Sequence, residues 1–230
     1  MKSKHRTEKS PKQPLAIVAY EAIVQRIISL EYQPSQHLEE SQLMADLGIG
    51  RTPVREALVR LQGEKMVESH PNKGVIVRPI TLQNTKAMFE SMSIFEFGVA
   101  DIAATKNCTL AIQKMKQSNK LIEKTVREGD LLGMVEANHQ FHMDFAGASQ
   151  NEFLIRATHD VRSEAKRLSY LSFNTEIAPD QSLDSHYDSV VAEHDELIAR
   201  LEAKDIHGVK QLLQAHIETF RKRIIHFMVS

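Results

Sequence analysis

Three histidines in the C-terminal part of the chain each fall on the apolar stripe of a separate helical pattern. His142 lies in ANHQFH, His194 in AEHDELI and His216 in AHIETF, and Asn138 stands one helical turn before His142. Imidazole nitrogens and amide oxygens are ligands for divalent transition metals. Since a buried polar group needs a partner, the pattern predicts either a shared metal ion or separate hydrogen bonds within the core.

Two arginines in GIGRTPVREALVRL, residues 48–61, could read DNA. Arg51 and Arg55 are four residues apart, so both lie on one face of a helix. The opposite face carries Val54, Ala57, Leu58 and Leu61 at spacings of three and four, and it is expected to pack inward. Two guanidinium groups at a helix N-terminus fit the major groove, where Arg pairs with guanine O6 and N7. A solvated surface helix is the alternative for this spacing taken alone.

The elements around these arginines favour the DNA-reading interpretation. An apolar stripe predicts a helix from Pro14 that is broken at Pro34, and a short helix follows from Glu39 to Leu47, closed by Gly48. Either Gly50 or Thr52 can cap the third helix. Two β-rich runs then flank PNKG, where Gly74 can take the positive φ of a tight hairpin. Helix, helix, turn, helix and hairpin in this order predict a winged helix-turn-helix.

Charge and cysteine content limit the class of protein. Residues 1–80 carry 12 Lys+Arg and 9 Asp+Glu, a balance of +3, while the remainder carries 17 and 21, a balance of −4. This asymmetry has the sign expected if the N-terminal part meets phosphate. Cys108 is the single cysteine, which excludes an internal disulfide and fits a reducing compartment. With neither a secretory signal nor an apolar run long enough to span a bilayer, we expect a cytoplasmic protein without a membrane partner.

The chain is predicted to be mostly α-helical and to have three parts. Residues 1–12 form a basic tail that is disordered by composition, and residues 13–80 form the winged helix-turn-helix. Residues 81–230 read as an all-α bundle of six or seven amphipathic helices. His139, His159 and His207 lie off the apolar stripes of this bundle and are expected to be solvated.

The segment from LEESQLMADLG through RTPVREAL to GVIV resembles the DNA-binding domain of the GntR family of bacterial transcription regulators. The resemblance implies that Arg51, Thr52 and Arg55 contact DNA. It also implies that Ser41 touches a phosphate and that Lys73 and Gly74 form the tip of the wing. Three positions depart from the family pattern: Gly50 replaces a usual Ser or Thr, and Leu30 and Ser35 replace glycines before the second helix.

The histidine segments resemble those of the FCD domain, the helical effector domain of the FadR branch of GntR regulators. The resemblance implies that Asn138, His142, His194 and His216 hold a divalent ion, with Zn²⁺ or Ni²⁺ favoured, at the floor of an effector pocket. Asn138 stands where many relatives carry Asp, which removes a negative charge near the ion. Relatives also carry an Arg at the position of Met92, where it pairs with a carboxylate effector. We therefore expect an effector pocket that does not take a simple dicarboxylate through this position.

These features together predict a DNA-binding transcriptional regulator, with repression as the expected sign. Two protomers would associate through their helical domains and bind a pseudo-palindromic double-stranded operator. A small-molecule effector, for which an organic acid is one candidate, would bind beside the metal and change operator affinity. One alternative is a metal-dependent hydrolase, but there is no HExxH, and Glu193 points about a quarter-turn away from His194. The other alternative is a helical domain whose histidines only bond within the core.

Overall fold

A computed structural model describes residues 13–71, 74–175 and 182–229. The chain divides into two compact units between Arg78 and Pro79. The predicted basic tail, residues 1–12, lies outside the described residues, and so does Lys73. Among the described residues, no helix is long and apolar enough to cross a membrane.

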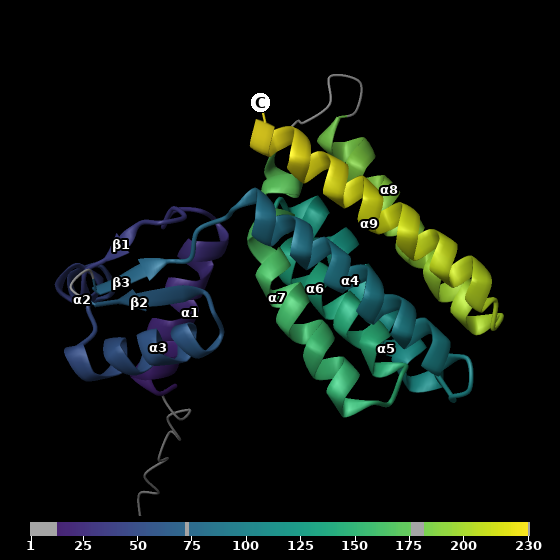
Figure 1. Cartoon of the computed structure of the whole chain (residues 1–230), viewed down its shortest axis with the longest axis horizontal. Coiled ribbons are helices and arrows are strands. Elements are labelled where there is room, and N and C mark those ends of the chain that lie inside the picture. Colours follow the sequence, from purple (N-terminus) through teal and green to yellow (C-terminus); the bar gives the residue numbers. More distant parts are fainter. Residues whose placement is uncertain (1–12, 72–73, 176–181, 230) are drawn as a thin grey trace, which may run out of the picture. The chain divides into compact units, whose positions relative to one another are not determined.

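The first unit combines three helices with a small sheet (Figure 1). Its elements are α1 (Leu15–Ile28), β1 (His37–Leu38), α2 (Glu40–Leu47), α3 (Arg51–Gly63), β2 (Val67–His70) and β3 (Gly74–Val77). The strands are antiparallel in the order β1-β3-β2, with Leu38 opposite Val75 and Ser69 opposite Val75 on the two sides of β3. The predicted winged helix-turn-helix is thereby confirmed.

One apolar core holds this unit together. The inward residues of α1, including Ala19, Ile23 and Ile27, pack with the predicted inner face of α3. Gly48 ends α2 with φ 63°, as its sequence position predicts. Gly50 is the N-cap of α3 and offers no side-chain hydrogen bond, which leaves the first-turn amides of this helix uncapped.

Leu30 and Ser35, which replace two glycines of the family pattern, both adopt the backbone conformation that glycine favours. Leu30 has φ 60° and Ser35 has φ 68°, so both adopt the left-handed conformation that glycine would take without steric cost. Ser35 is nevertheless anchored, because its amide donates to the carbonyl of Val77 at 2.9 Å. The loop before β1 therefore keeps its geometry despite the two substitutions.

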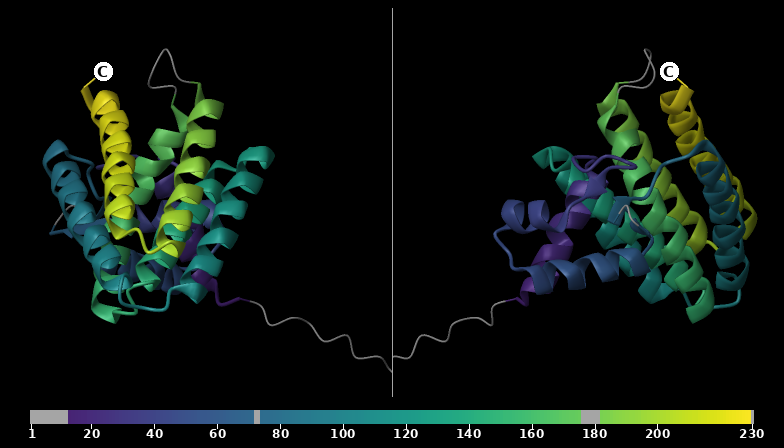
Figure 2. Two further views of the ribbon diagram at one scale, coloured as in Figure 1. Left: turned by 90° about the vertical axis from the view of Figure 1, so that its right-hand side faces the viewer. Right: turned by 60° about the vertical axis from the view of Figure 1, so that its left-hand side comes forward.

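The second unit is a bundle of six helices in the described part of the chain, within the predicted six or seven. These are α4 (Leu82–Ala103), α5 (Thr109–Glu128), α6 (Leu131–Gly147), α7 (Glu152–Asn174), α8 (Leu183–Glu202) and α9 (Ile206–Val229). Most of their long axes run side by side (Figure 2). Four of the helices begin at side-chain caps, provided by Thr81, Asp130, Asn151 and Ser182, each of which accepts a first-turn amide.

Helix α6 lies at the centre of this bundle. It packs against α5 and α7, while α8 packs on α5 and α9 packs on α4 and α8. Buried residues surround α6, and Ala137, Asn138 and His139 are buried in succession. The expectation that His139 is solvated is wrong, since a helix enclosed on several sides buries residues beyond its apolar stripe.

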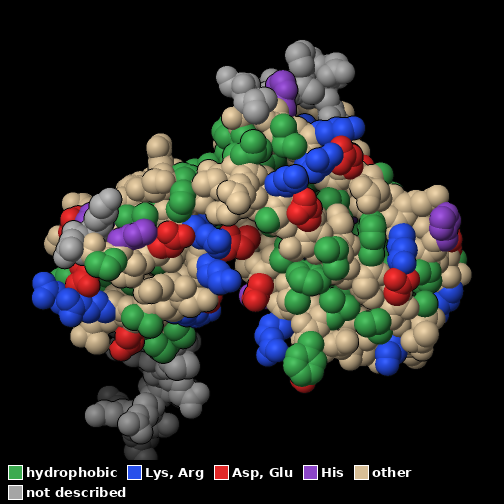
Figure 3. Space-filling view, viewed as in Figure 1, with side chains coloured by type: hydrophobic (Ala, Val, Ile, Leu, Met, Phe, Trp, Pro, Cys, Tyr) green, Lys and Arg blue, Asp and Glu red, His purple; other side chains and the backbone are tan. Residues whose placement is uncertain are grey.

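On the visible face of the helical unit, basic and acidic side chains are interspersed (Figure 3).

Candidate DNA-reading helix and metal centre

The arginines of α3 project from an element whose other face is fixed in the core. Val54, Ala57, Leu58 and Leu61 are buried, which leaves the side chains of Arg51 and Arg55 64% and 59% exposed. Thr52 and Ser41 are exposed as well, at the starts of α3 and α2. The N-terminus of α3 thus offers two guanidinium groups and free amides to solvent, as a major-groove or phosphate contact requires.

Glu40, which was not among the predicted site residues, contacts both arginines. The Nε atom of Arg55 donates to Glu40 Oε1 at 2.9 Å and to Oε2 at 2.8 Å, and Arg51 Nε lies 4.0 Å from Oε2. An exposed ion pair of this kind contributes at most about 1 kcal/mol, so DNA could compete with it. The carboxylate therefore contacts both arginines of α3 without sequestering them. Glu40 begins α2, beside the helix whose arginines point outward, and this position in the sequence could have predicted the contact.

Gly74 at the start of β3 is required by its surroundings. Its φ is +71°, and a Cβ built on it would lie 2.7 Å from His37 Nε2. A side chain there would be strained by both the backbone and the contact with β1. The predicted hairpin glycine is thus in the conformation expected of it.

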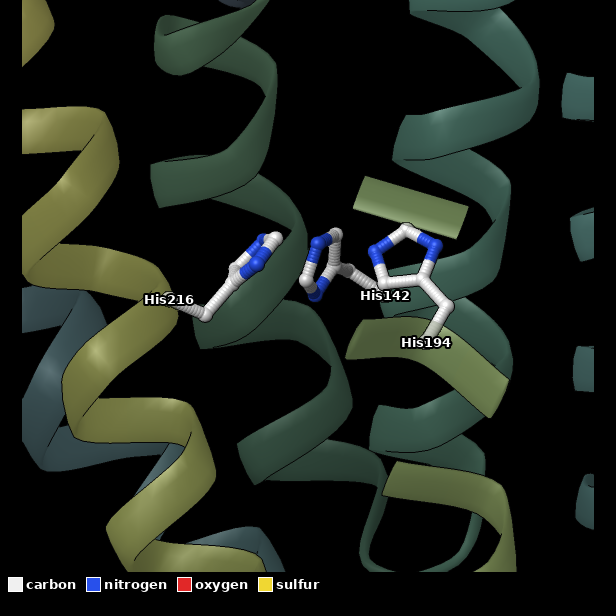
Figure 4. A group of neighbouring side chains, drawn as sticks. All are labelled: His142, His194 and His216. Atoms are coloured by element: carbon white, nitrogen blue, oxygen red, sulfur yellow. The ribbon is translucent and has the colours of Figure 1, made fainter. Parts of the chain in front are cut away.

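The three predicted histidines meet in the helical unit (Figure 4). His142 comes from α6, His194 from α8 and His216 from α9, and one ligand nitrogen of each lies within 4.8 Å of the others. His142 and His194 are fully buried, while His216 is partly buried. The ring of Phe141 stacks on His194 with 3.7 Å between ring centroids, which fixes that imidazole plane.

Each imidazole presents its Nδ1 atom to a separate oxygen. His216 Nδ1 lies 2.5 Å from Glu193 Oε2, His194 Nδ1 lies 3.1 Å from Asn119 Oδ1, and His142 Nδ1 lies 3.5 Å from Glu96 Oε1. The hydrogen bonds of His216 and His194 favour the tautomer with the proton on Nδ1, so Nε2 of these two rings keeps its lone pair for a ligand. Such outer partners are typical of metal-binding histidines. His142 Nδ1 makes no hydrogen bond with Glu96 at 3.5 Å.

Asn119 is itself held in one orientation. Its Nδ2 group donates to the Val191 carbonyl at 3.1 Å and to Asp195 Oδ1 at 2.8 Å. Because both donor hydrogens have acceptors, the amide oxygen must face His194. Neither Asn119 nor Glu96 was predicted, since each lies on a helix that carries no member of the histidine set.

Glu193 was expected to point about a quarter-turn away from His194, and its contact with His216 was not predicted. Glu193 and His194 do face different sides of α8, but α9 brings His216 to the side on which Glu193 lies. Burial raises the pKa of the Glu193 carboxyl, whereas the hydrogen bond and charge of His216 lower it, with a lowered pKa as the net result. Glu193 is thus an ionised partner of His216.

Several buried polar atoms near this cluster have no hydrogen-bond partner among the described residues. They are Glu96 Oε2, Asn138 Oδ1, both ring nitrogens of His142, and His194 Nε2. Each such atom costs about 1–3 kcal/mol when it stays unpaired. His142 and His194 belong to the group whose ligand nitrogens lie within 4.8 Å of one another, so one cation would reach both rings. The three histidines therefore fit a divalent transition metal, while Asn138, whose buried Oδ1 has no hydrogen bond, stays a predicted oxygen donor.

Burial keeps the cluster in the state that binds metal. Desolvation lowers the pKa of both His142 and His194 well below the usual value, and the positive charge of Arg162 lowers them further. Neutral imidazole is the form that donates a lone pair to a metal. The imidazoles of His142 and His194 are therefore neutral at pH 7.

A small cavity of about 30 Å³ adjoins the cluster. Asn138, Glu193 and His216 line it together with Arg162 and the hydroxyl groups of Ser169, Ser172, Ser189 and Thr219. Met92 is buried in α4 but does not line this cavity, so the structure does not place it in an effector pocket here. The exposed side chains of His159 and His207, by contrast, lie where they were expected.

Comparison with known proteins shows which family this chain belongs to. The family model described as bacterial regulatory proteins, gntR family, matches residues 15–77, and the FCD domain matches residues 87–219. The chain belongs to the GntR family and carries an FCD domain. GntR regulators of this type bind DNA and control transcription, so the protein is a transcriptional regulator and not an enzyme.

Several characterised regulators are similar to this GntR-family chain. The Nta operon transcriptional regulator of Aminobacter aminovorans is 28% identical over 62% of this chain and 66% of its own length. The Uxu operon transcriptional regulator of Escherichia coli is 25% identical over 87% of this chain and 83% of its own. A GntR regulator structure from Rhodococcus sp. RHA1 has a TM-score of 0.72 at 20% identity, covering 91% of this chain and 97% of that one. At that identity, the structure supports the fold alone.

Proposed function

We propose that this regulator is a homodimeric repressor whose operator affinity is set by a small molecule bound beside a divalent metal in the FCD domain. The observation that carries the proposal is the meeting of three imidazoles, two of them hydrogen-bonded through Nδ1, at the edge of a small cavity. A recognition helix with outward arginines supports the DNA half of the proposal, and Arg51, Thr52, Arg55 and Ser41 are its proposed contacts.

The metal would be held by His142, His194 and His216, with Asn138 as an additional oxygen donor. Zn²⁺ and Ni²⁺ suit an imidazole-rich set with one neutral oxygen. When bound, such an ion would supply positive charge beside the cavity. The chain's own part is to hold the imidazoles of His194 and His216 in one tautomer through Asn119 and Glu193.

A dimer would place two winged domains on successive half-sites of a pseudo-palindrome. The effector could change operator affinity only by binding more tightly to one arrangement of the helical domain than to another. Because the cavity is small and its wall includes Arg162 and several hydroxyl groups, an organic acid of few atoms is the proposed effector class. Relief of repression on binding is the proposed sign.

The test is a paired measurement on untagged protein. Metal content after purification should be close to one equivalent for the parent and near zero for His194→Ala, while circular dichroism of the two stays alike. Operator binding, measured by fluorescence anisotropy with and without a chelator, should change for the parent and not for His194→Ala. Unchanged metal content in the variant would leave the histidines as core hydrogen-bonding groups only and would refute the site.

A further inference from the structure

Val59 on α3 carries an exposed apolar side chain. It is 70% exposed, the highest value for a large hydrophobic residue in the part of the chain that the structure describes. The other large aliphatic residues of this helix, Val54, Leu58 and Leu61, are buried. Single apolar residues are common on protein surfaces, so exposure alone assigns no role to Val59. Its position on the helix and its neighbours are more specific.

Helical geometry places Val59 on the face that carries the proposed DNA contacts. Since an α-helix has about 3.6 residues per turn, Val59 follows Arg55 by roughly one turn and Thr52 by roughly two. Thr52 and Arg55 are both exposed, while the buried residues of α3 lie on the opposite side. Base-contacting residues of a recognition helix can span two helical turns. Val59 is therefore in position to reach the groove that Thr52 and Arg55 would enter.

The charged residues nearest to Val59 in the sequence, Glu56 and Arg60, are not placed to bind a DNA phosphate. Arg60 Nε donates to Glu64 Oε1 at 3.0 Å, and the Arg60 guanidinium lies 3.6 Å from the centroid of the Tyr20 ring. These contacts hold Arg60 against its own unit. Glu56 is exposed, and a carboxylate there repels phosphate. The surface around Val59 thus favours an uncharged part of the groove over the DNA backbone.

Thymine carries the apolar group that the major groove exposes, its C5-methyl. Apolar side chains distinguish thymine from cytosine by contact with this methyl, because cytosine has only a hydrogen at C5. Contact with the methyl groups of Val59 removes apolar surface of both partners from water, which is favourable. We propose that Val59 reads a thymine methyl group in the operator and so adds a specificity determinant to the arginines of α3.

The rise of α3 limits where this thymine can lie. Val59 is four residues from Arg55, which corresponds to about 6 Å along the helix axis. Successive bases on one strand are about 3.4 Å apart. The thymine should therefore lie within about three base pairs of the base that Arg55 contacts, in the same half-site. The inference rests on the proposed DNA contacts of α3 and extends them to a side chain without hydrogen-bonding groups.

The experiment uses the full-length protein and synthetic DNA. Duplexes with a randomised centre are selected for binding to the parent protein, and the enriched sequence supplies the operator duplex. Each thymine of one half-site, with its symmetry mate, is then replaced by deoxyuridine, which removes the C5-methyl and keeps the base pairing. Fluorescence anisotropy at one salt concentration gives the affinity of the parent, Val59→Ala and Val18→Ala for every duplex. Val18 lies on α1 and is 36% exposed, so Val18→Ala is the matched control.

We expect one thymine position at which deoxyuridine weakens binding of the parent about fourfold per half-site, as loss of one buried methyl contact implies. Val59→Ala should bind the unmodified operator more weakly by at least that factor, and deoxyuridine at this position should have no further effect. At all other thymines the two proteins should respond alike. Val18→Ala should match the parent throughout. A purely structural role of Val59 would instead lower the affinity for every duplex equally and leave the response to each deoxyuridine unchanged.

The inference is wrong if no thymine within reach of Val59 is sensitive to loss of its methyl, or if deoxyuridine affects Val59→Ala and the parent equally at every thymine. Circular dichroism checks that each variant folds. Because Val59 is exposed and alanine favours the helix, Val59→Ala should be as stable as the parent. If it does not fold, Val59→Gln, which also lacks the isopropyl group, replaces it and should lose the same response.

Arg55→Ala separates this inference from the proposed function. If Arg55→Ala loses discrimination between operator and scrambled DNA while Val59→Ala keeps the thymine response of the parent, only the reading by Val59 fails. If both variants behave like the parent, or if selection enriches no sequence, α3 does not read DNA and both proposals fail.

Discussion

Glu193 Oε2 lies 2.5 Å from His216 Nδ1, so a carboxylate on α8 sets the tautomer of an imidazole on α9. The two helices pack against each other, and Glu193 also accepts a hydrogen bond from Ser189 at 3.3 Å. An anionic acceptor makes the opposite ring nitrogen a stronger electron-pair donor. The geometry of the proposed metal site thus depends on residues that would not touch the ion.

Glu193→Gln should weaken zinc binding by about 10-fold or more while the helical content stays unchanged. Glutamine keeps the shape of the side chain but offers a neutral acceptor, so His216 Nε2 becomes less basic. Zinc affinity from dye competition is the measurement. Glu196→Gln is the matched control, because Glu196 lies on the same helix and pairs with Arg200 in solvent. Equal affinity of Glu193→Gln and the parent would mean that this hydrogen bond does not support the metal site.

Arg55→Ala should reduce discrimination between operator and unrelated DNA by roughly 1–3 kcal/mol. The arginine is exposed at the head of α3, where it can reach a base edge. Anisotropy titrations with specific and scrambled duplexes, run at one salt concentration, give the discrimination directly. Lys124→Ala, on the exposed side of α5, is the control and should behave like the parent. A variant that binds its operator as selectively as the parent would refute the assignment of α3.

Glu40→Gln should change DNA affinity and discrimination in a different way from Arg55→Ala. Removing the carboxylate releases both arginines from a shared partner and removes a negative charge near the DNA phosphates. We expect affinity for scrambled DNA to rise and discrimination to fall, because the arginines lose their common orientation. Binding to the two duplexes over a series of salt concentrations separates these effects. If both affinities fell in parallel, Glu40 would be supporting the fold of α2 instead of positioning the arginines.

The sequence was sufficient for the features that depend on local pattern. The repeat of Val54, Ala57, Leu58 and Leu61 determines which face of α3 packs inward, and the same logic places His142, His194 and His216 toward a common core. It was insufficient where helices far apart in sequence meet. Glu96, Asn119 and Arg162 each lie on a helix without a member of the histidine set, so only the packing of the bundle reveals their contacts. His139 was misjudged for the same reason, because its burial depends on how many helices surround α6.

Acid should destabilise the metal-free protein in part through His186. Burial, together with the charge of Arg223, lowers the pKa of His186 to about 4 from 6.5. The unfolded state therefore binds the proton first as the pH falls, and stability is lost progressively between about pH 6.5 and pH 4. This histidine contributes up to about 1.4 kcal/mol per pH unit in that window. Urea denaturation in the presence of chelator should show a shallower pH dependence for His186→Gln than for the parent. The exposed His159 supplies the control, and His159→Gln should leave the slope as it is.

Ser35→Gly should stabilise the winged unit by roughly 0.5–1 kcal/mol. Ser35 is exposed and held at φ 68°, where its Cβ is strained and glycine is not. Part of the gain is offset because glycine is more flexible in the unfolded chain. Ser29→Gly is the matched control: Ser29 ends α1 with φ −73°, so glycine there relieves no strain and should destabilise. Opposite signs for the two substitutions, measured by urea denaturation, would show that the left-handed backbone at position 35 is the cause. If both variants lost stability, the loop before β1 would not be strained at Ser35.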